Sequence, residues 1–227
     1  MTVALVLATF ITFLVIDYFL SRKKAPVFAE QLQPARQTSA APRPIPNLVN
    51  GFQVPDHLRY HPGHTWALSE SPNLVRMGMD DFASKLIGKV ESISLPQRGQ
   101  WIRQGQKILS FKKNGVAVEM VSPIEGSVSD VNEAVLANPE AARQDPYGEG
   151  WLLTVQSPDA KTNFRNLMGG VLARTWMEEA VTRLLKRLPA PTGALALAQD
   201  GGVATDELAA GVPAQEYKTI TQEFFLV

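Results

Sequence analysis

Two runs of β-forming residues meet at the dipeptide Asn114-Gly115. Every second residue from Val116 to Met120 is apolar, which is the spacing of a half-buried strand. Asn and Gly readily take positive φ, as both central residues of a type I′ turn require. Residues 110–126 therefore predict a protruding β-hairpin with Lys112, Lys113, Asn114 and Gly115 at or near its tip.

The segments on either side of this hairpin resemble each other. Residues 88–93 and 126–131 share the form Gly-x-Val-x-x-aliphatic, and a turn segment from Gly99 to Gly105 lies between them. Two such halves related by a pseudo-twofold axis predict a mainly β fold, a flattened barrel of four-stranded halves. The expected core positions are Trp101, Ile102, 108–111, Val128, Val131 and 151–155.

Helices are expected at three places. Residues 80–86 predict a short amphipathic helix capped by Asp80 or Asp81, and residues 132–140 predict a loop with one helical turn. The closing segment 163–188, with a break at Gly169-Gly170, ends in a helix with one apolar stripe. The stripe consists of Met177, Val181, Leu184 and Leu188. Its basic neighbours Arg183, Lys186 and Arg187 either face solvent or contact anionic lipid.

The N-terminal stretch from Val3 to Leu20 is an apolar run with a single charge, Asp17. Its 18 residues nearly span a bilayer core of about 30 Å, so the run predicts a transmembrane helix. Together with the basic flank that follows, the anchor comprises residues 1–24. Asp17 lies near the end of the run, at the headgroup level or facing a partner helix. The basic flank Arg22, Lys23 and Lys24 indicates that the N-terminus lies outside and the rest lies in the cytoplasm, in the inner membrane of the cell.

Residues 25–56 contain six prolines without sustained periodicity, which predicts an extended tether or an ordered strap on a partner. Residues 189–227 are rich in Ala, Gly and Pro and predict a low-complexity tail. Its apolar end, from Phe224 to Val227, either docks on a partner or folds back on the barrel.

Composition excludes several classes of function. The chain of 227 residues has a formal net charge of 0 and no cysteine, so it shows no basic face for nucleic acid and offers no thiolate chemistry. His57, His61 and His64 include an H-x3-H spacing, but Pro62-Gly63 prevents the helix that a metal site of this kind needs. No nucleophile triad or phosphate loop is present. We expect no enzyme activity, no cofactor and no metal.

A family resemblance covers residues 57–188. The matching stretches are YHPGHTW at 60–66, VRMGMDDFASKLIG at 75–88, SPIEGSV at 122–128 and DPYGEGWL at 145–152. With them the domain resembles the H protein of the glycine cleavage system, a member of the lipoyl-domain superfamily. The resemblance implies a lipoyl-type barrel and, in the family, a lysine at the hairpin tip that carries the lipoyl arm.

The lipoyl lysine itself is absent from the expected position. In the family it stands eight residues before the Pro of the next Ser-Pro or Ala-Pro pair, and counting back from Pro123 reaches Gly115. Lys112 and Lys113 lie two or three residues early, and a shift of one residue in a strand reverses the direction of its side chain. Three residues before its lysine the family usually has an acidic residue, and the corresponding position here is Lys112.

These features lead to a hypothesis of a non-catalytic, membrane-anchored, H-protein-like scaffold subunit of a larger complex, without lipoylation. One alternative is a lipoyl carrier modified at Lys113 or Lys112. A further alternative is a membrane-fusion adaptor of a transport system, which combines an N-terminal helix with a lipoyl-like barrel. In such adaptors a long coiled coil separates the two halves of the barrel, and the barrel lies outside the cytoplasm. Here the hairpin joins the halves directly and the basic flank indicates a cytoplasmic domain, so we rank the adaptor last.

Overall fold

A computed structural model of the chain describes residues 14–15, 18, 48–188, 204 and 206–227, and the chain divides into two units, Met1–Pro44 and Ile45–Val227. The expected anchor Val3 to Leu20 lies almost wholly outside the described residues, as do Asp17, Arg22 to Lys24 and the tether up to residue 47. Among the residues that are described, no helix is long and apolar enough to cross a membrane.

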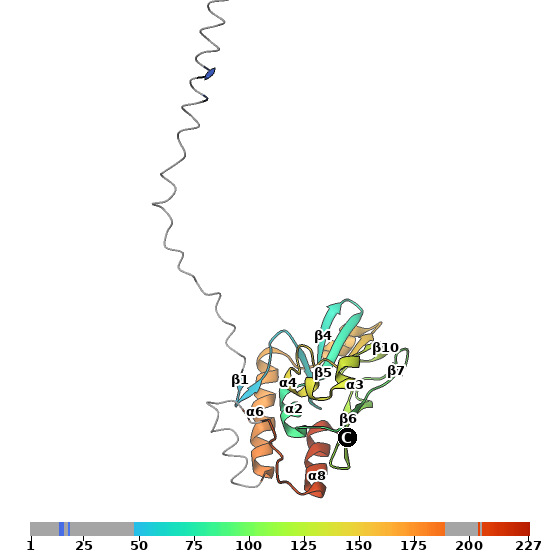
Figure 1. Cartoon of the computed structure of the whole chain (residues 1–227), viewed down its shortest axis with the longest axis vertical. Helices are drawn as coiled ribbons and strands as arrows, with labels where there is room; N and C mark the ends of the chain where they lie inside the picture. Colours follow the sequence, from blue (N-terminus) through green and yellow to red (C-terminus); the bar gives the residue numbers. More distant parts are fainter. Residues whose placement is uncertain (1–13, 16–17, 19–47, 189–203, 205) are drawn as a thin grey trace, which may run out of the picture. The chain divides into compact units, whose positions relative to one another are not determined.

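The second unit contains two main β-sheets (Figure 1). The larger has six strands in the order β3-β4-β5-β11-β10-β7, and the smaller has three in the order β6-β8-β9. The strands of the larger sheet are β3 (Arg59–His61), β4 (Thr65–Ser71), β5 (Leu74–Met79), β11 (Leu153–Gln156), β10 (Gly126–Val131) and β7 (Trp101–Ile102). Those of the smaller are β6 (Ser92–Ser94), β8 (Lys107–Lys113) and β9 (Val116–Val121). All strand pairs are antiparallel.

The repeated Gly-x-Val-x-x-aliphatic segments lie in different sheets, β6 in the smaller and β10 in the larger. The strands divide six to three rather than four to four. Strands β3 and β4 extend the larger sheet beyond the four strands β5, β11, β10 and β7, and the smaller sheet has one strand fewer than expected. Residues from both sheets belong to one core cluster, which includes Met77 and Val155 of the larger sheet and Phe111 and Met120 of the smaller. The mainly β fold expected from the sequence is confirmed.

Most of the expected core positions are buried, including Ile102, Leu109, Phe111, Val128 and Leu153. Trp101 was predicted wrongly, since its side chain is 50% exposed. Successive side chains of a strand point to opposite faces, and its neighbour Ile102 takes the inward position of β7.

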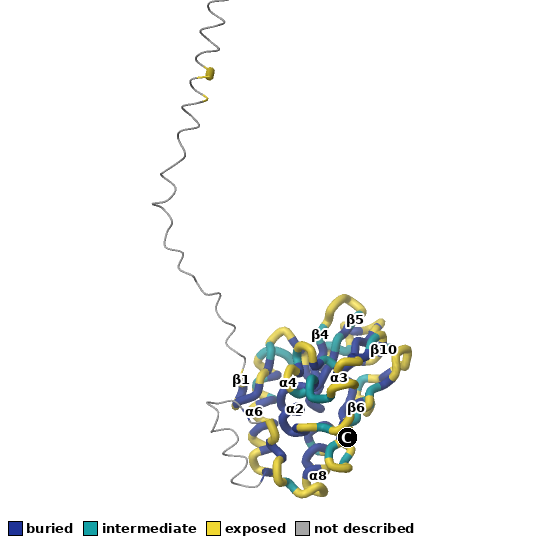
Figure 2. Tube along the Cα trace, in the orientation of Figure 1, coloured by how far each residue is buried: buried dark blue, intermediate teal, exposed yellow. Residues whose placement is uncertain are grey.

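Helix α2 (Asp81–Ile87) begins after Asp80, whose carboxylate accepts a hydrogen bond from Ala83 N at 2.8 Å. The predicted cap is confirmed. All seven residues of α2 are buried, so the helix is not amphipathic as expected (Figure 2). Its two charged residues tolerate burial because Lys85 Nζ donates to Asp81 Oδ2 at 2.8 Å.

Four further helices follow α2 before residue 188. They are α3 (Glu133–Ala137), α4 (Glu140–Gln144), α5 (Ala160–Arg165) and α6 (Gly170–Arg187). Helix α6 starts at the predicted break and buries the predicted stripe, Met177, Val181, Leu184 and the following Leu188. Asn132 caps α3, where one helical turn was expected.

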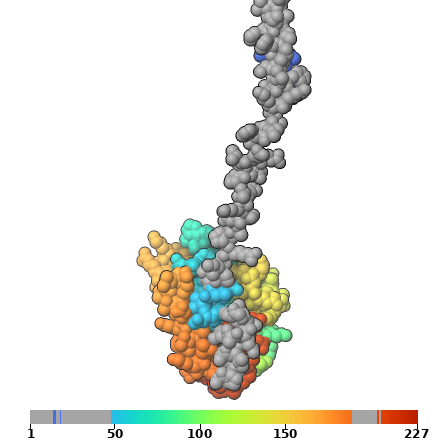
Figure 3. Space-filling view, turned by 90° about the vertical axis from the view of Figure 1, so that its left-hand side faces the viewer, coloured from blue at the N-terminus to red at the C-terminus, as the bar shows by residue number. Residues whose placement is uncertain are grey.

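The folded unit extends beyond both boundaries expected from the sequence. Upstream, β1 (Leu48–Val49) and β2 (Phe52–Gln53) form a small hairpin beside α6, and Phe52 is buried (Figure 3). Downstream, α8 (Ala214–Phe225) packs against β9 and α6 (Figure 1). The tether and the low-complexity tail are therefore shorter than expected, because these segments carry enough apolar surface to join the core. The sequence left open whether the apolar C-terminus docks on a partner or folds back on the barrel. In the structure it folds back, as part of α8.

Candidate functional site

The hairpin between β8 and β9 has the turn that its sequence predicts. Lys113 pairs with Val116, which leaves Asn114 and Gly115 as a two-residue loop with φ values of 49° and 77°. Positive φ at both central positions is the requirement of the type I′ turn. A Cβ added to Gly115 would meet nothing within 4 Å. The position expected for a lipoyl lysine is therefore open but has no side chain.

The two neighbouring lysines have different surroundings. Lys112, which pairs with Ala117, is exposed, whereas Lys113 is half-buried. Lys113 Nζ donates to the backbone oxygen of Ile87 at 2.8 Å and lies 5.5 Å from the ring centroid of Tyr217. Burial lowers the pKa of Lys113, and the nearby carboxylate of Glu207 opposes this shift. The amine nearest the tip is thus held beneath the C-terminal segment.

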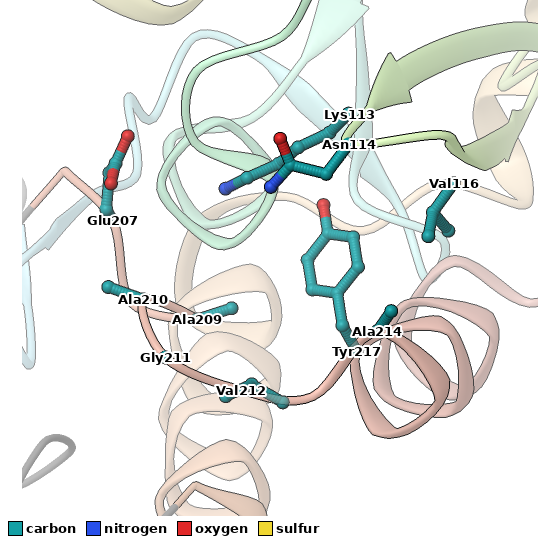
Figure 4. A pocket seen from close by; sticks show the side chains of 10 residues that line it. All are labelled: Lys113, Asn114, Val116, Glu207, Ala209, Ala210, Gly211, Val212, Ala214 and Tyr217. Atoms are coloured by element: carbon teal, nitrogen blue, oxygen red, sulfur yellow. The ribbon is translucent and has the colours of Figure 1, made fainter.

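The segment from Asp206 to Tyr217 forms a wall next to the hairpin tip. Leu208 N donates to the backbone oxygen of Lys85 at 3.1 Å, and Tyr217 Oη donates to that of Ile87 at 3.3 Å. Arg143 Nη1 lies 2.8 Å from Asp206 Oδ2. Figure 4 shows the Tyr217 ring pointing toward Lys113 and Asn114, with Glu207 at the other end of the same hollow. Burial raises the pKa of the Tyr217 phenol, so it remains a hydrogen-bond donor at neutral pH.

Helix α8 is held in place by an apolar face and by basic residues of α6. Tyr217, Ile220, Phe224 and Phe225 are buried. The guanidinium of Arg183 lies 5.2 Å from the ring centroid of Phe224, and Arg187 Nη2 lies 2.7 Å from Glu223 Oε2. Two of the three basic residues for which the sequence left open a solvent or lipid contact therefore contact α8.

His64 and Asp80 form a buried polar pair in the core. His64 Nδ1 lies 2.8 Å from Asp80 Oδ2, and both side chains are fully buried. The imidazole stacks on Phe82 with a centroid separation of 4.1 Å. His64 Nε2 has no hydrogen-bond partner in the part of the chain that the structure describes.

The three histidines do not assemble into a metal centre. His61 Nδ1 accepts a hydrogen bond from Gly63 N at 3.0 Å, which requires the unprotonated nitrogen. The pKa of His61 is lowered by burial and, to a smaller extent, by His64. His57 is exposed. Among the described residues no group of three or more His, Cys, Asp or Glu side chains could hold a metal ion.

The 145–152 segment, which carried much of the resemblance, braces the fold. Trp66 Nε1 donates to the backbone oxygen of Pro146 at 2.9 Å. Tyr147 Oη donates to the backbone oxygen of Gln53 at 2.6 Å and accepts from Asp81 N at 3.0 Å. These bonds join β4, β2 and α2, so the motif has a structural role in this chain.

Glu207 and Tyr217 are the residues of this site that sequence reasoning missed. The spacing of Tyr217, Ile220, Phe224 and Phe225 contained a usable signal, because positions i, i+3, i+7 and i+8 share one face of a helix. No comparable local signal points to Glu207, whose place depends on the docking of α8.

Comparison with known proteins identifies relatives of the central part of this chain. The family model described as glycine cleavage H-protein matches residues 58–180. The glycine cleavage system H protein of Prochlorococcus marinus (strain NATL2A) is 35% identical over 117 residues, which cover 52% of this chain and 90% of the relative. That of Anaeromyxobacter sp. (strain K) is 32% identical over 128 residues, covering 56% and 98%.

A solved H protein from Mycobacterium marinum is 25% identical, with a TM-score of 0.43 and coverage of 46% of this chain and 87% of its own. The family match begins after β2 and ends within α6, so neither the first 57 residues nor α8 belongs to the matched region. Residues 58–180 contain the hairpin, both main sheets and the 145–152 motif. The chain belongs to the glycine cleavage H-protein family.

Proposed function

We propose that this protein is a non-catalytic H-protein-like subunit that serves as a scaffold in a larger membrane-associated complex and carries no lipoyl group. The observation that carries the proposal is the state of the hairpin tip. Gly115 offers no amine, and the ammonium of Lys113 is bonded to Ile87 beneath Tyr217. An amine in that position is unavailable to a ligase that acylates an exposed lysine.

Lys112 is the other amine near the tip. It is exposed, but it lies within β8, where it pairs with Ala117 and Ser92, rather than in the turn. Acylation there would place the arm two residues before the loop, on the opposite face of the strand from Lys113. The geometry therefore favours a scaffold over a carrier shifted to either lysine.

The proposed membrane anchor rests on the sequence of Val3 to Leu20 and its basic flank Arg22 to Lys24. An anchor restricts a protein to one surface, which suits a fixed subunit better than a diffusing carrier. In this arrangement the N-terminus lies outside and the barrel domain faces the cytoplasm. Other subunits of the complex are the expected partners, with no nucleic acid among them.

Intact-mass measurement of the full chain, purified from its native membrane in mild detergent, tests the absence of a lipoyl group. We expect the unmodified mass. A mass increase of one lipoyl group that disappears in Lys113→Arg, or in Lys112→Arg, would establish the carrier function at that lysine instead. Chains that co-purify in the same detergent would identify the complex.

A reporter fused after Val227 tests the orientation. Activity of a cytoplasmic reporter is the expected result. Activity of a reporter that functions only outside the cytoplasm would reverse the topology and favour the adaptor function.

A further inference from the structure

A cavity of about 270 Å³ lies between the hairpin tip and the C-terminal segment (Figure 4). Its apolar lining comes from Val116 on one side and from Ala209, Val212 and Ala214 on the other. Small-molecule sites typically have an apolar lining with a few polar groups, and pockets for drug-sized ligands measure about 300–1,000 Å³. This cavity therefore suits a ligand smaller than a drug.

Polar groups with unused hydrogen-bonding capacity line the cavity. An ammonium has three donors, and Lys113 uses one of them toward Ile87. The side-chain amide of Asn114 and the carboxylate of Glu207 have no hydrogen-bond partner among the described residues, and both line the cavity. Lys113 and Asn114 therefore supply donors at one end, while Glu207 supplies acceptors at the other.

The charges of Lys113 and Glu207 are opposite and close enough that the carboxylate acts electrostatically on the ammonium. A Cβ added to Gly88 would lie 2.8 Å from Lys113 Nζ and 3.4 Å from Glu207 Cγ, so both side chains pass close to Gly88. They form no ion pair within 4.0 Å in the described part of the chain. A ligand with one negative and one positive group matches this arrangement.

We propose that the cavity binds a small zwitterion, an α-amino acid with a short aliphatic side chain. Its carboxylate accepts hydrogen bonds from Lys113 Nζ and the Asn114 amide, and its ammonium faces Glu207. The aliphatic group contacts Val116 and Val212. A dianion such as phosphate is disfavoured because it would face Glu207 and also Glu91, whose Oε1 accepts from Asn114 N at 2.9 Å.

The C-terminal segment creates this site. Seven of the ten lining residues, from Glu207 to Tyr217, come from it, and the family match ends at residue 180. A bound ligand would link the segment to the hairpin tip through both ends of the cavity. The site requires a free amine at Lys113, so it rests on the proposed absence of a lipoyl group there.

Isothermal titration of the full chain in mild detergent with L-valine tests the site. A ligand of about eight non-hydrogen atoms makes few contacts, so a Kd of about 1 mM is expected. Two analogues test the contributions of the ligand's ammonium and carboxylate one at a time: 3-methylbutanoate lacks the ammonium, and isobutylamine lacks the carboxylate. Each should bind about tenfold more weakly than valine.

Variants assign each end of the ligand to a residue. Glu207→Gln should weaken valine about tenfold and abolish the difference between valine and 3-methylbutanoate. Lys113→Met should also weaken valine about tenfold, and it should abolish the difference between valine and isobutylamine. Lys112→Met, one residue away but outside the cavity, should bind valine like the unaltered chain. Lys113→Met also removes the contact with the Tyr217 ring of α8. Glu207 is exposed, so Glu207→Gln tests the site without removing that contact.

Saturable valine binding with this pattern supports the proposal. Absence of saturable binding at several times the expected Kd overturns it, and so does equal binding by all variants. Intact mass of the same sample separates the two proposals: a lipoyl group would contradict the scaffold function, whereas an unmodified chain that binds no valine contradicts only the amino-acid site.

Discussion

Asp80 and His64 join the start of α2 to the start of β4 through a 2.8 Å contact between Oδ2 and Nδ1. The other carboxylate oxygen of Asp80 caps α2 through Ala83 N. Asp80→Ala removes both interactions and leaves a buried imidazole without its partner. We expect a loss of about 2–4 kcal/mol in the free energy of unfolding, combining a lost cap with a buried unpaired group.

Urea unfolding of the full chain, followed by tryptophan fluorescence, measures this loss. Asp80→Asn is the matched control, since an amide oxygen still accepts at the cap, and it should retain more stability than Asp80→Ala. Equal stability of Asp80→Ala and the unaltered chain would contradict the role assigned to the pair.

Gly115→Lys restores an amine at the second turn position. The backbone there has a φ of 77°, and the space around a new side chain is open. The loss of stability therefore comes mainly from holding a non-glycine residue in a left-handed conformation. A stability loss of about 1–2 kcal/mol is expected. Incubation with a lipoate ligase and lipoate should then give a lipoylated mass for Gly115→Lys and none for the unaltered chain. Labelling of both to the same extent would show that another lysine is the acceptor.

Phe225→Ala should release α8 from the domain. Phe225 is fully buried, and truncation of a buried Phe costs about 3–5 kcal/mol. Hydrogen exchange across residues 214–225 should become faster while β4 and β5 keep their protection. Glu216→Gln, on an exposed position of the same helix, is the control and should leave exchange unchanged. Unchanged exchange in Phe225→Ala would mean that α8 is held by other contacts.

His61 should make the domain less stable in mild acid. Its pKa is lowered in the folded state, so between that lowered pKa and the ordinary value of 6.5 the unfolded chain binds more protons. Stability therefore rises with pH through this window and is lower below it. His61→Gln should flatten the dependence, while exposed His57→Gln should leave it intact. Denaturant titrations from pH 4 to pH 8 provide the comparison, and an unchanged slope in His61→Gln would contradict the prediction.

Local sequence signals predicted the parts of the fold that depend on local chemistry. Asn114-Gly115 specified the turn, and Asp80 specified the start of α2. The apolar stripe of α6 was visible because a helix repeats every 3.6 residues. In each case few residues, close in sequence, determine the structure.

Features that depend on distant contacts were not predictable in this way. Trp101 has the composition of a core residue, and only its register opposite Ser127 in β10 places it outside. The burial of α2 follows from packing by Phe52 and Phe224, which come from segments assigned to the tether and the tail. The sequestered state of Lys113 needs Tyr217, more than one hundred residues further along the chain.

The place of α8 in the chain also affects how the protein is made. Everything that α8 covers, including β9 and α6, precedes it in sequence. Thirty-eight residues separate the end of α6 at Arg187 from the end of α8 at Phe225, and a ribosome needs about 2–8 s to add them. The apolar surface that Tyr217, Ile220 and the two phenylalanines later cover stays exposed for at least that interval, until α8 has left the ribosome and docked. Chaperones that bind exposed apolar surface can therefore bind this domain until α8 docks.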